Sequence, residues 1–198
     1  MTRGQFLERP ALVPVAGRVL EALAHRGRRL PSLLVVPPPP GEGGMDHVVA
    51  LELVWAATRA GHPTLRFNFR GVGASPGPPG DAGSRRVDIE AALGVLRENA
   101  GAAPVALAAL GGSAVEVLQL AGAGAAVAGV ALVHPERLSS GGLASVRLPL
   151  LLVVGAEARV EAAVETALER ASGSLVTAAG LPEVGRSVAR WLEKLPTP

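Results

Sequence analysis

The chain has 198 residues, of which 48% are hydrophobic, and it contains 25 glycines, 17 prolines and no cysteine. This length is typical of one domain and is sufficient to bury a hydrophobic core. The lack of cysteine excludes a disulfide framework, a thiolate nucleophile and cysteine-ligated metal centres. A net charge of +2 with 3% aromatic residues argues against a nucleic-acid partner, because nucleic-acid binding relies on positive charge and aromatic stacking.

Charged residues lie near the N-terminus, at Arg3, Glu8 and Arg9, where a signal peptide needs an apolar stretch. We therefore expect a cytoplasmic protein. The uncharged run 117–134 is nearly long enough to span a membrane, but glycines interrupt it, and we predict a helix end, a turn and a buried strand there. We interpret the basic segment 25–29 as a solvated turn rather than a phosphate site.

The first 30 residues contain two short apolar runs, Ala11–Val15 and Arg18–Ala24, joined near Gly17. This pattern predicts an antiparallel hairpin at the edge of a larger sheet. The Pro- and Gly-rich segments 37–44 and 71–83 are typical of loops after strands and not of interdomain linkers. We therefore predict a single domain over residues 1–198 with an N-terminal edge hairpin over residues 1–30.

From residue 31 onward, short apolar runs alternate with helical patterns, which predicts an α/β fold with a mostly parallel sheet and helices on both faces. The predicted strands are Ser32–Val36, Thr64–Phe69, Val105–Leu110, Val127–Val133, Leu150–Val154 and Ser174–Ala178. The predicted helices are Asp46–Ala60, Arg85–Asn99 with Ser84 as its N-cap, Arg159–Ala171, and an amphipathic C-terminal helix that buries Trp191. Ligand sites of such sheets form at the carboxyl ends of the strands, where the loops 37–44 and 71–83 begin.

The segment Pro37–Gly44 with Met45–Val49 after it, and the string Arg66-Phe67-Asn68-Phe69-Arg70-Gly71-Val72-Gly73, resemble the small, nearly lidless members of the α/β-hydrolase superfamily. These proteins are similar to dienelactone hydrolases and esterases. Asp88 matches the acidic residue that opens the next helix. The resemblance implies an α/β-hydrolase fold over roughly residues 30–196. It also implies a serine nucleophile on a sharp strand-to-helix elbow, an acid and a histidine in that chain order, and an oxyanion hole.

The elbow that the resemblance implies follows the strand Val105–Leu110. In one register the Gly-x-Ser-x-Gly pattern falls on residues 109–113, and Gly111, which has no side chain, takes the nucleophile position. In the register two residues later Ser113 is the nucleophile, although Val115 then replaces the second glycine. The alternative for Ser113 is a helix N-cap or first-turn serine.

The other two triad positions also differ from the pattern. By the resemblance, Ala158 falls where the aspartate is expected and Leu181 lies near the expected histidine. No aspartate follows residue 88, and all four histidines precede residue 135. The substitutes that the sequence offers are Glu157 as the acid and His134 as a base for Ser113.

The oxyanion hole that the resemblance implies is incomplete, because prolines 37–39 have no N–H to donate. A donor then has to come from residues 41–44 folding back. Arg66 and Arg70 either bind an anionic substrate or brace loops through carboxylates and carbonyls. For a ligand pocket at this edge of the sheet we expect Pro38, Gly41, Gly43, Gly44, Arg70 and Gly112.

Other chemistries fit less well, because the sole lysine, Lys194, rules out a phosphate loop and the histidines are too sparse for a metal site. We expect no metal, no cofactor and no membrane span. The sequence predicts a pseudohydrolase, with its catalytic residues lost, that binds a small molecule or a protein partner, with homo-oligomers allowed. The alternatives are an ester or thioester hydrolase that uses Ser113 and a structural subunit of an assembly.

Overall fold

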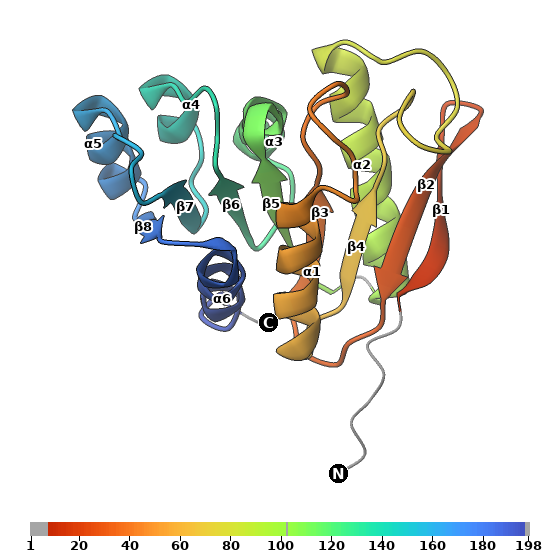
Figure 1. Ribbon diagram of the computed structural model, residues 1–198, viewed down its shortest axis with the longest axis horizontal. Coiled ribbons are helices and arrows are strands. Elements are labelled where there is room, and N and C mark those ends of the chain that lie inside the picture. The colour runs from red at the N-terminus through yellow and green to blue at the C-terminus, as the bar shows by residue number, and fades with distance from the viewer. Residues whose placement is uncertain (1–7, 102, 197–198) are drawn as a thin grey trace.

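The computed structural model describes residues 8–101 and 103–196, and its strands form one eight-stranded sheet (Figure 1). The strand order is β1-β2-β4-β3-β5-β6-β7-β8. The pairs β1/β2 and β2/β4 are antiparallel and all the other neighbours are parallel. The strands are β1 (Arg9–Val15), β2 (Arg18–His25), β3 (Ser32–Val36), β4 (Thr64–Phe67), β5 (Val105–Leu110), β6 (Gly129–Val133), β7 (Leu150–Gly155) and β8 (Ser174–Ala178). The predicted fold class, with its antiparallel N-terminal edge, is confirmed.

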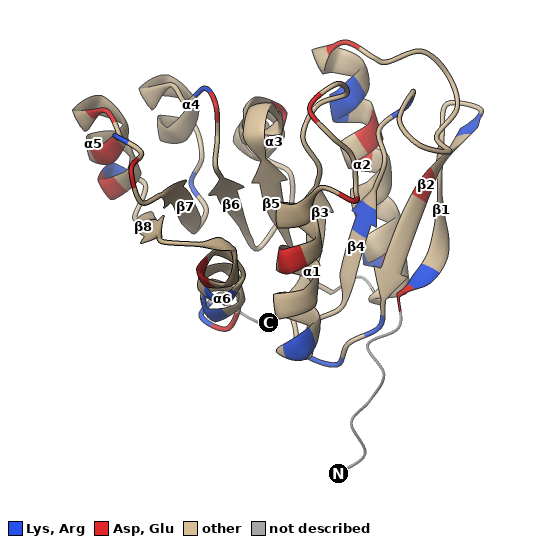
Figure 2. Ribbon diagram, in the orientation of Figure 1, with Lys and Arg blue, Asp and Glu red and all other residues tan. Residues whose placement is uncertain are grey.

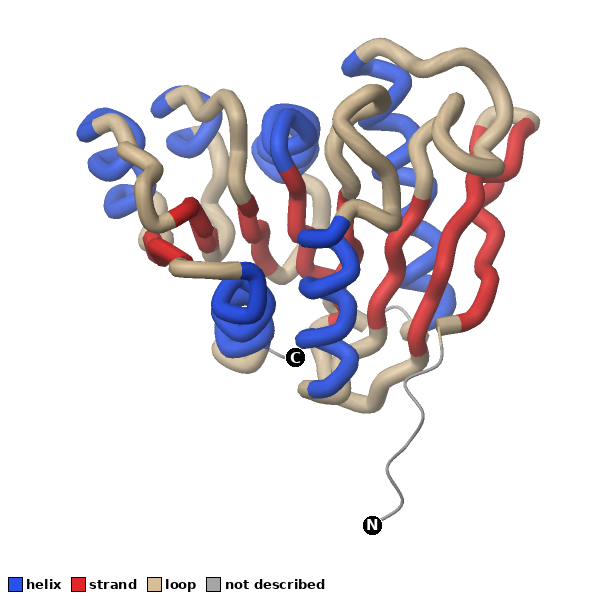
Figure 3. The backbone as a smooth tube through the Cα atoms, viewed as in Figure 1, coloured by secondary structure: helices blue, strands red, loops and turns tan. Residues whose placement is uncertain are grey.

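Helices cover both faces of the sheet, which therefore has a hydrophobic core on each side (Figures 1 and 3). One core contains side chains of α1 (Val48–Arg59) and α6 (Leu181–Leu192), and the other contains side chains of α2 (Ala82–Asn99), α3 (Ala114–Gly122), α4 (Ser140–Ala144) and α5 (Ala162–Arg170). The strands β3, β5, β6 and β7 carry no charged residue because they are covered on both faces (Figure 2). In the described part of the chain, no helix combines the length and the apolar character that a membrane crossing requires.

The edge hairpin turns over two residues, Ala16 and Gly17, which both have positive φ (45° and 75°). Two consecutive residues of this kind match the right-handed twist of the strands that they join. The turn sets the register so that Val15 faces Arg18 and Val13 faces Leu20. Val13, Val15 and Leu20 enter the core, and the edge hairpin thereby extends the sheet beyond β4.

Helix ends account for most differences from the predicted elements. Ser84 is not the N-cap of α2, because the Asp81 carboxylate accepts from the Ser84 N–H at 2.8 Å and the helix already begins at Ala82. The first predicted helix begins later, at Val48, since His47 caps it. Strand β4 ends at Phe67, two residues early, and β6 begins at 129 rather than 127.

The helices after β6 agree only in part with the prediction. Helix α5 is shorter than predicted at both ends, and the short helix α4 was not predicted. Trp191 belongs to the core beneath α6, as predicted from its place in the apolar stripe.

Candidate functional site

The turn from β5 into the next helix has the shape of an elbow, and Gly111 occupies its apex. Gly111 has φ +54°, in the left-handed region that glycine adopts without a steric penalty. A Cβ at this position would lie 3.4 Å from Glu42 Oε2 and 3.9 Å from Glu136 Oε1. The chain continues as a single 3₁₀ turn, Gly111–Ser113, into α3. The residue that the first register puts at the nucleophile position therefore stands at the apex, faces a pocket and offers no nucleophilic atom.

Ser113 lies two residues beyond the apex and is completely buried. Its backbone is helical, with φ −67° and ψ −8°, and its side chain makes no capping bond. The hydroxyl instead donates to the main-chain carbonyl of Pro37 at 2.7 Å. Within the described residues, no hydrogen bond joins Ser113 to His134, the base that the sequence offered for it. The Ser113 hydroxyl is directed to Pro37, and His134 lines a pocket whose lining does not include Ser113.

A pocket of about 240 Å³ opens beside the apex. Its residues come from the loop after β3, from the start of α1 and from the ends of β5 and β6. The apolar wall consists of aliphatic side chains, and the polar wall of two carboxyl groups and two imidazoles. The lining residues are Pro38, Glu42, His47, Val49, Leu110, Gly111, Val133, His134 and Glu136. We call this the elbow pocket.

The two carboxyl groups of the elbow pocket interact with each other. Glu42 Oε2 and Glu136 Oε1 lie 3.4 and 3.9 Å from the point where a Gly111 Cβ would lie, so both carboxyl groups reach the apex. Burial raises the pKa of Glu42, the charge of Glu136 raises it further, and the Gly112 N–H opposes both effects. In the fold that the sequence resembles, the N–H after the nucleophile is an oxyanion-hole donor. Here the Glu42 carboxylate lies next to the residue at that position, with Oε1 3.6 Å from the point where a Gly112 Cβ would lie.

The two histidines lie on different elements. His134 directly follows β6 with φ +46°, and its N–H donates to Val153 O at 2.8 Å. Burial lowers the pKa of His134, and His47 lowers it further. His47 caps α1, since its Nδ1 accepts from the Val49 N–H at 3.3 Å.

The positions expected for the acid and the histidine lie on other loops. Glu157 and Ala158 are exposed in the turn after β7, where the Ala158 N–H donates to Gly155 O at 3.0 Å. Leu181 is the first residue of α6 and packs against the core on that face of the sheet. None of the three lines the elbow pocket.

The predicted pocket residues are spread over several places. Pro38 lines the elbow pocket, and Gly112 lies beside it, against Pro39 and the Glu42 carboxylate. Gly41 and Gly43 are exposed on the tip of the same loop with positive φ (97° and 144°). Gly44 lies against Asn68, whose Oδ1 would be 2.6 Å from an added Cβ.

Arg70 lies outside the elbow pocket. Its guanidinium pairs with the fully buried carboxylate of Asp88, with 2.5 Å between Nη2 and Oδ1, and also donates to Ser84 O. The backbone N–H of Arg70 donates to Asp88 as well. Arg70 therefore ties the beginning of the 71–83 loop to α2, which is the bracing role and not the anion-binding role.

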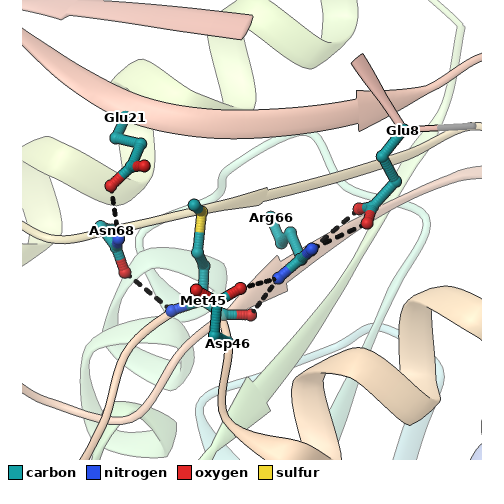
Figure 4. Close-up of polar contacts among 6 residues, drawn as sticks. All are labelled: Glu8, Glu21, Met45, Asp46, Arg66 and Asn68. Carbon is teal, nitrogen blue, oxygen red and sulfur yellow. Dashed lines mark hydrogen bonds and ion pairs between the residues drawn. The ribbon is translucent and has the colours of Figure 1, made fainter. Parts of the chain in front are cut away.

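Arg66 braces the other loop. Its Nε and Nη2 donate to the two Glu8 carboxylate oxygens at 2.8 and 2.7 Å (Figure 4). Its Nη1 donates to Met45 O at 2.8 Å and to Asp46 Oδ1 at 2.5 Å. These bonds satisfy a buried guanidinium and fix the end of the 37–47 loop on β4.

Asn68 completes this support, because its amide has partners on two other segments. The Asn68 Oδ1 accepts from the Met45 N–H at 2.8 Å, and its Nδ2 donates to Glu21 at 2.8 Å (Figure 4). The Asn68 carbonyl accepts from the Ser75 hydroxyl. The bond to Met45 spans 23 residues of the sequence. Sequence reasoning also missed Glu8, Glu21, Glu42 and Glu136, for which no motif or spacing gave a signal.

Comparison with protein-family models and with curated protein sequences gives no match. Solved structures do match. An alpha-beta serine hydrolase homologue from Coxiella burnetii is 22% identical with a TM-score of 0.73, over 92% of this chain and 96% of that one. Est1E from Butyrivibrio proteoclasticus, with ferulic acid bound, is 13% identical with a TM-score of 0.79, over 93% and 98% of the two chains.

A third structure is XC6422 from Xanthomonas campestris, described as a member of the a/b serine hydrolases without a lid. It is 19% identical with a TM-score of 0.74, and 96% of each chain is covered. These matches span nearly the whole length of both chains in each pair, although the sequences have diverged widely. The chain therefore has the α/β-hydrolase fold.

Proposed function

We propose that this protein is a non-catalytic member of the α/β-hydrolase fold that binds a small molecule in the elbow pocket. The observation that carries the proposal is Gly111 at the apex of the elbow, where a nucleophilic side chain would have to project. A fold alone does not fix a function, so the proposal rests on the residues of the site. Aliphatic side chains and a few polar groups both line the pocket, which suits a small, partly polar ligand.

The expected acid and histidine positions support the same proposal. Ala158 and Leu181 offer no proton-transfer group, and Glu157 lies in an exposed turn. Acid–base catalysis requires a titratable group within hydrogen-bond reach of the reacting atoms. The titratable groups of the elbow pocket lie around Gly111, which has no reacting side chain, and the pocket lining does not include Ser113.

Ester or thioester hydrolysis by Ser113 is the competing function. Two observations argue against this function. Ser113 is completely buried, and its hydroxyl donates a hydrogen bond to the Pro37 carbonyl. A serine nucleophile needs a base that accepts its proton, and a carbonyl oxygen cannot act as one. Hydrolysis by Ser113 would require both the 37–47 loop and the hydroxyl to rearrange.

Covalent labelling with a fluorophosphonate probe tests the proposal. We expect intact-mass spectra of the wild-type protein to show no adduct beyond that of Ser113→Ala, while a known serine esterase in parallel labels fully. Stoichiometric labelling that Ser113→Ala abolishes would overturn the proposal. Ligand binding is tested by a fragment screen with ¹⁵N spectra, in which binders should shift the Gly111 and Gly112 amides.

A protein partner is the second candidate, favoured by the outer face of α1. Val48, Leu51 and Trp55 form an apolar stripe there and are 56%, 40% and 51% exposed. Their spacing puts them on one side of the helix, and exposed apolar patches commonly mark interaction sites. Sedimentation of wild type and Trp55→Glu tests this role. Self-association that Trp55→Glu abolishes would assign the stripe to an interface between copies.

A further inference from the structure

The outer face of α1 forms the wall of a groove of about 510 Å³. Helix α1 lies between α6 and the edge hairpin (Figure 1). Leu181 and Pro182 line the groove from α6, and Glu8, which directly precedes β1, lines it from the hairpin. The three side chains of the apolar stripe of α1 also belong to the lining, and they are 40–56% exposed. We call this the α1 groove.

Glu8 is held firmly at the edge of the α1 groove. Its two carboxylate oxygens accept from Arg66, at 2.8 Å from Nε and 2.7 Å from Nη2 (Figure 4). Arg66 points to the α1 side of the sheet, because its neighbours Leu65 and Phe67 enter the core on the other side. The chain therefore enters the described structure at a fixed point beside the α1 groove.

The spacing between Phe6 and Glu8 favours a contact of Phe6 with the groove. Side chains two residues apart point to the same side of an extended chain. Glu8 points to the α1 side, so an extended segment 6–8 directs Phe6 to that side as well. Two residues of extended chain span about 7 Å, and Glu8 already lines the groove. A phenyl ring and an exposed apolar stripe both gain from removal from water.

The charge and the length of the preceding residues also suit the groove. Its described lining contains two carboxyl groups, Glu8 and Glu52, and no lysine or arginine. Residues 1–7 contain Arg3 and no acidic residue, so the two charges are complementary. From Arg3 to Glu8 an extended chain spans about 17 Å. This exceeds the width of a helix with its side chains, which is about 10–12 Å.

We propose that residues 1–7 of this chain lie across the outer face of α1 and cover the α1 groove, with Phe6 against the apolar stripe. The inference goes beyond the proposed function and does not rest on it, because the α1 groove and the elbow pocket share no lining residue. The apolar stripe then serves the chain's own fold, and a second copy would have to displace the segment in order to bind there.

Covalent attachment favours the chain's own segment over a second copy. A group on a short linker has an effective concentration of about millimolar at a site that the linker can reach. A second copy offers its surface only at the concentration of the protein in solution. At protein concentrations well below millimolar, the attached segment therefore occupies the groove first.

A nuclear Overhauser contact between the Trp55 indole and a phenylalanine ring tests the proposal. The chain has three phenylalanines, and Phe67 and Phe69 lie in the core on the opposite face of the sheet. A contact of this kind therefore identifies Phe6. We expect it in the wild-type protein and not in Phe6→Ser. Gln5→Ser, which changes the neighbour that the register directs away from α1, is the matched control and should keep it.

An isotope-filtered spectrum of mixed labelled and unlabelled protein separates the two occupants of the groove. We expect the contact within one molecule only, so the filter should remove it. A contact that passes the filter would assign the groove to a second copy and overturn the proposal. Absence of any phenylalanine contact to Trp55 would overturn it as well. Both spectra use the wild-type protein, so neither depends on the folding of a variant.

Acrylamide quenching gives an independent readout of access to the stripe. The chain has two tryptophans, so Trp191→Phe leaves Trp55 as the sole emitter. In this background Phe6→Ser should make quenching about twofold stronger, because the stripe is then uncovered, and Gln5→Ser should leave it unchanged. Equal quenching in the three proteins would contradict the cover. Fluorophosphonate labelling of Ser113, in contrast, would overturn the proposed function and leave the cover of the α1 groove untouched.

Discussion

The hydroxyl of Ser113 donates to the carbonyl of Pro37 at 2.7 Å, across 76 residues of sequence. This bond joins the first turn of the elbow helix to the residue that follows β3, and both residues are buried. The serine that the sequence offered as a nucleophile thus connects two loops at the edge of the sheet.

Ser113→Ala should therefore lower the free energy of unfolding. The substitution leaves the buried Pro37 carbonyl without its partner, which costs about 1–2 kcal/mol. Urea unfolding followed by circular dichroism measures the change. Ser145→Ala is the control, because the Ser145 hydroxyl makes a bond of the same length to Gly142 O but in an exposed position. A loss no larger than that of Ser145→Ala would contradict a structural role for Ser113.

Arg66→Met should destabilise the fold more strongly. The substitution leaves the Glu8 carboxylate and the buried Met45 carbonyl without their donor. Because Asp46 is largely exposed and can be solvated, we expect about 3 kcal/mol, at the low end for a broken buried ion pair. Arg86→Met breaks an exposed pair with Glu90 and should cost less than about 0.5 kcal/mol. Similar losses for the two variants would show that Arg66 is not a brace.

Asp88→Asn should loosen the 71–83 loop. The Arg70 guanidinium would then face a neutral amide in place of the fully buried carboxylate, and the attachment of the loop to α2 would weaken. We expect a loss of about 3 kcal/mol and faster limited proteolysis within residues 71–83. Glu90→Gln, an exposed change on the same helix, should alter neither. Unchanged cleavage in Asp88→Asn would show that the Arg70–Asp88 pair does not hold the loop in place.

His62 should make stability depend on pH. Its Nδ1–H donates to Pro31 O at 2.9 Å and its Nε2 is buried without a partner among the described residues. Burial lowers the pKa of His62 below 6.5. Just below pH 6.5, His62 is therefore protonated in the unfolded chain while it is still neutral in the folded chain.

The contribution of His62 is therefore constant above pH 6.5 and falls as the pH drops below that value. Between pH 7.5 and 5.5, wild type should lose about 1 kcal/mol more than His62→Gln does in urea titrations. Identical losses in the two proteins would mean that His62 has the same pKa in the folded and the unfolded chain.

The strands could be predicted because burial on both faces imposes continuous apolar runs, as in the segments 32–36, 105–110 and 150–155. One of the two registers weighed from the sequence puts Gly111 at the elbow, because that position depends on where β5 ends and on a local sequence pattern. Helix starts were less predictable. His47 caps α1 and Asp81 caps α2. On sequence alone, Asp46 is an equally good N-cap for the first helix and Ser84 for the second.

The polar contacts of the site could not be predicted. The pairs Glu8 with Arg66 and Ser113 with Pro37 join segments far apart in the chain. Periodicity reveals which face of an element is apolar, but it contains no information on which charged side chain crosses from one loop to another. These contacts depend on how the loops fold over the sheet edge.

The left-handed conformation of Gly111 has a consequence for the energy of the backbone. Any residue with a side chain at the apex would hold about 1–2 kcal/mol of conformational strain in that turn. For a domain whose whole stability is about 5–15 kcal/mol, this is a substantial fraction. The glycine therefore lets the chain keep this sharp turn without that strain.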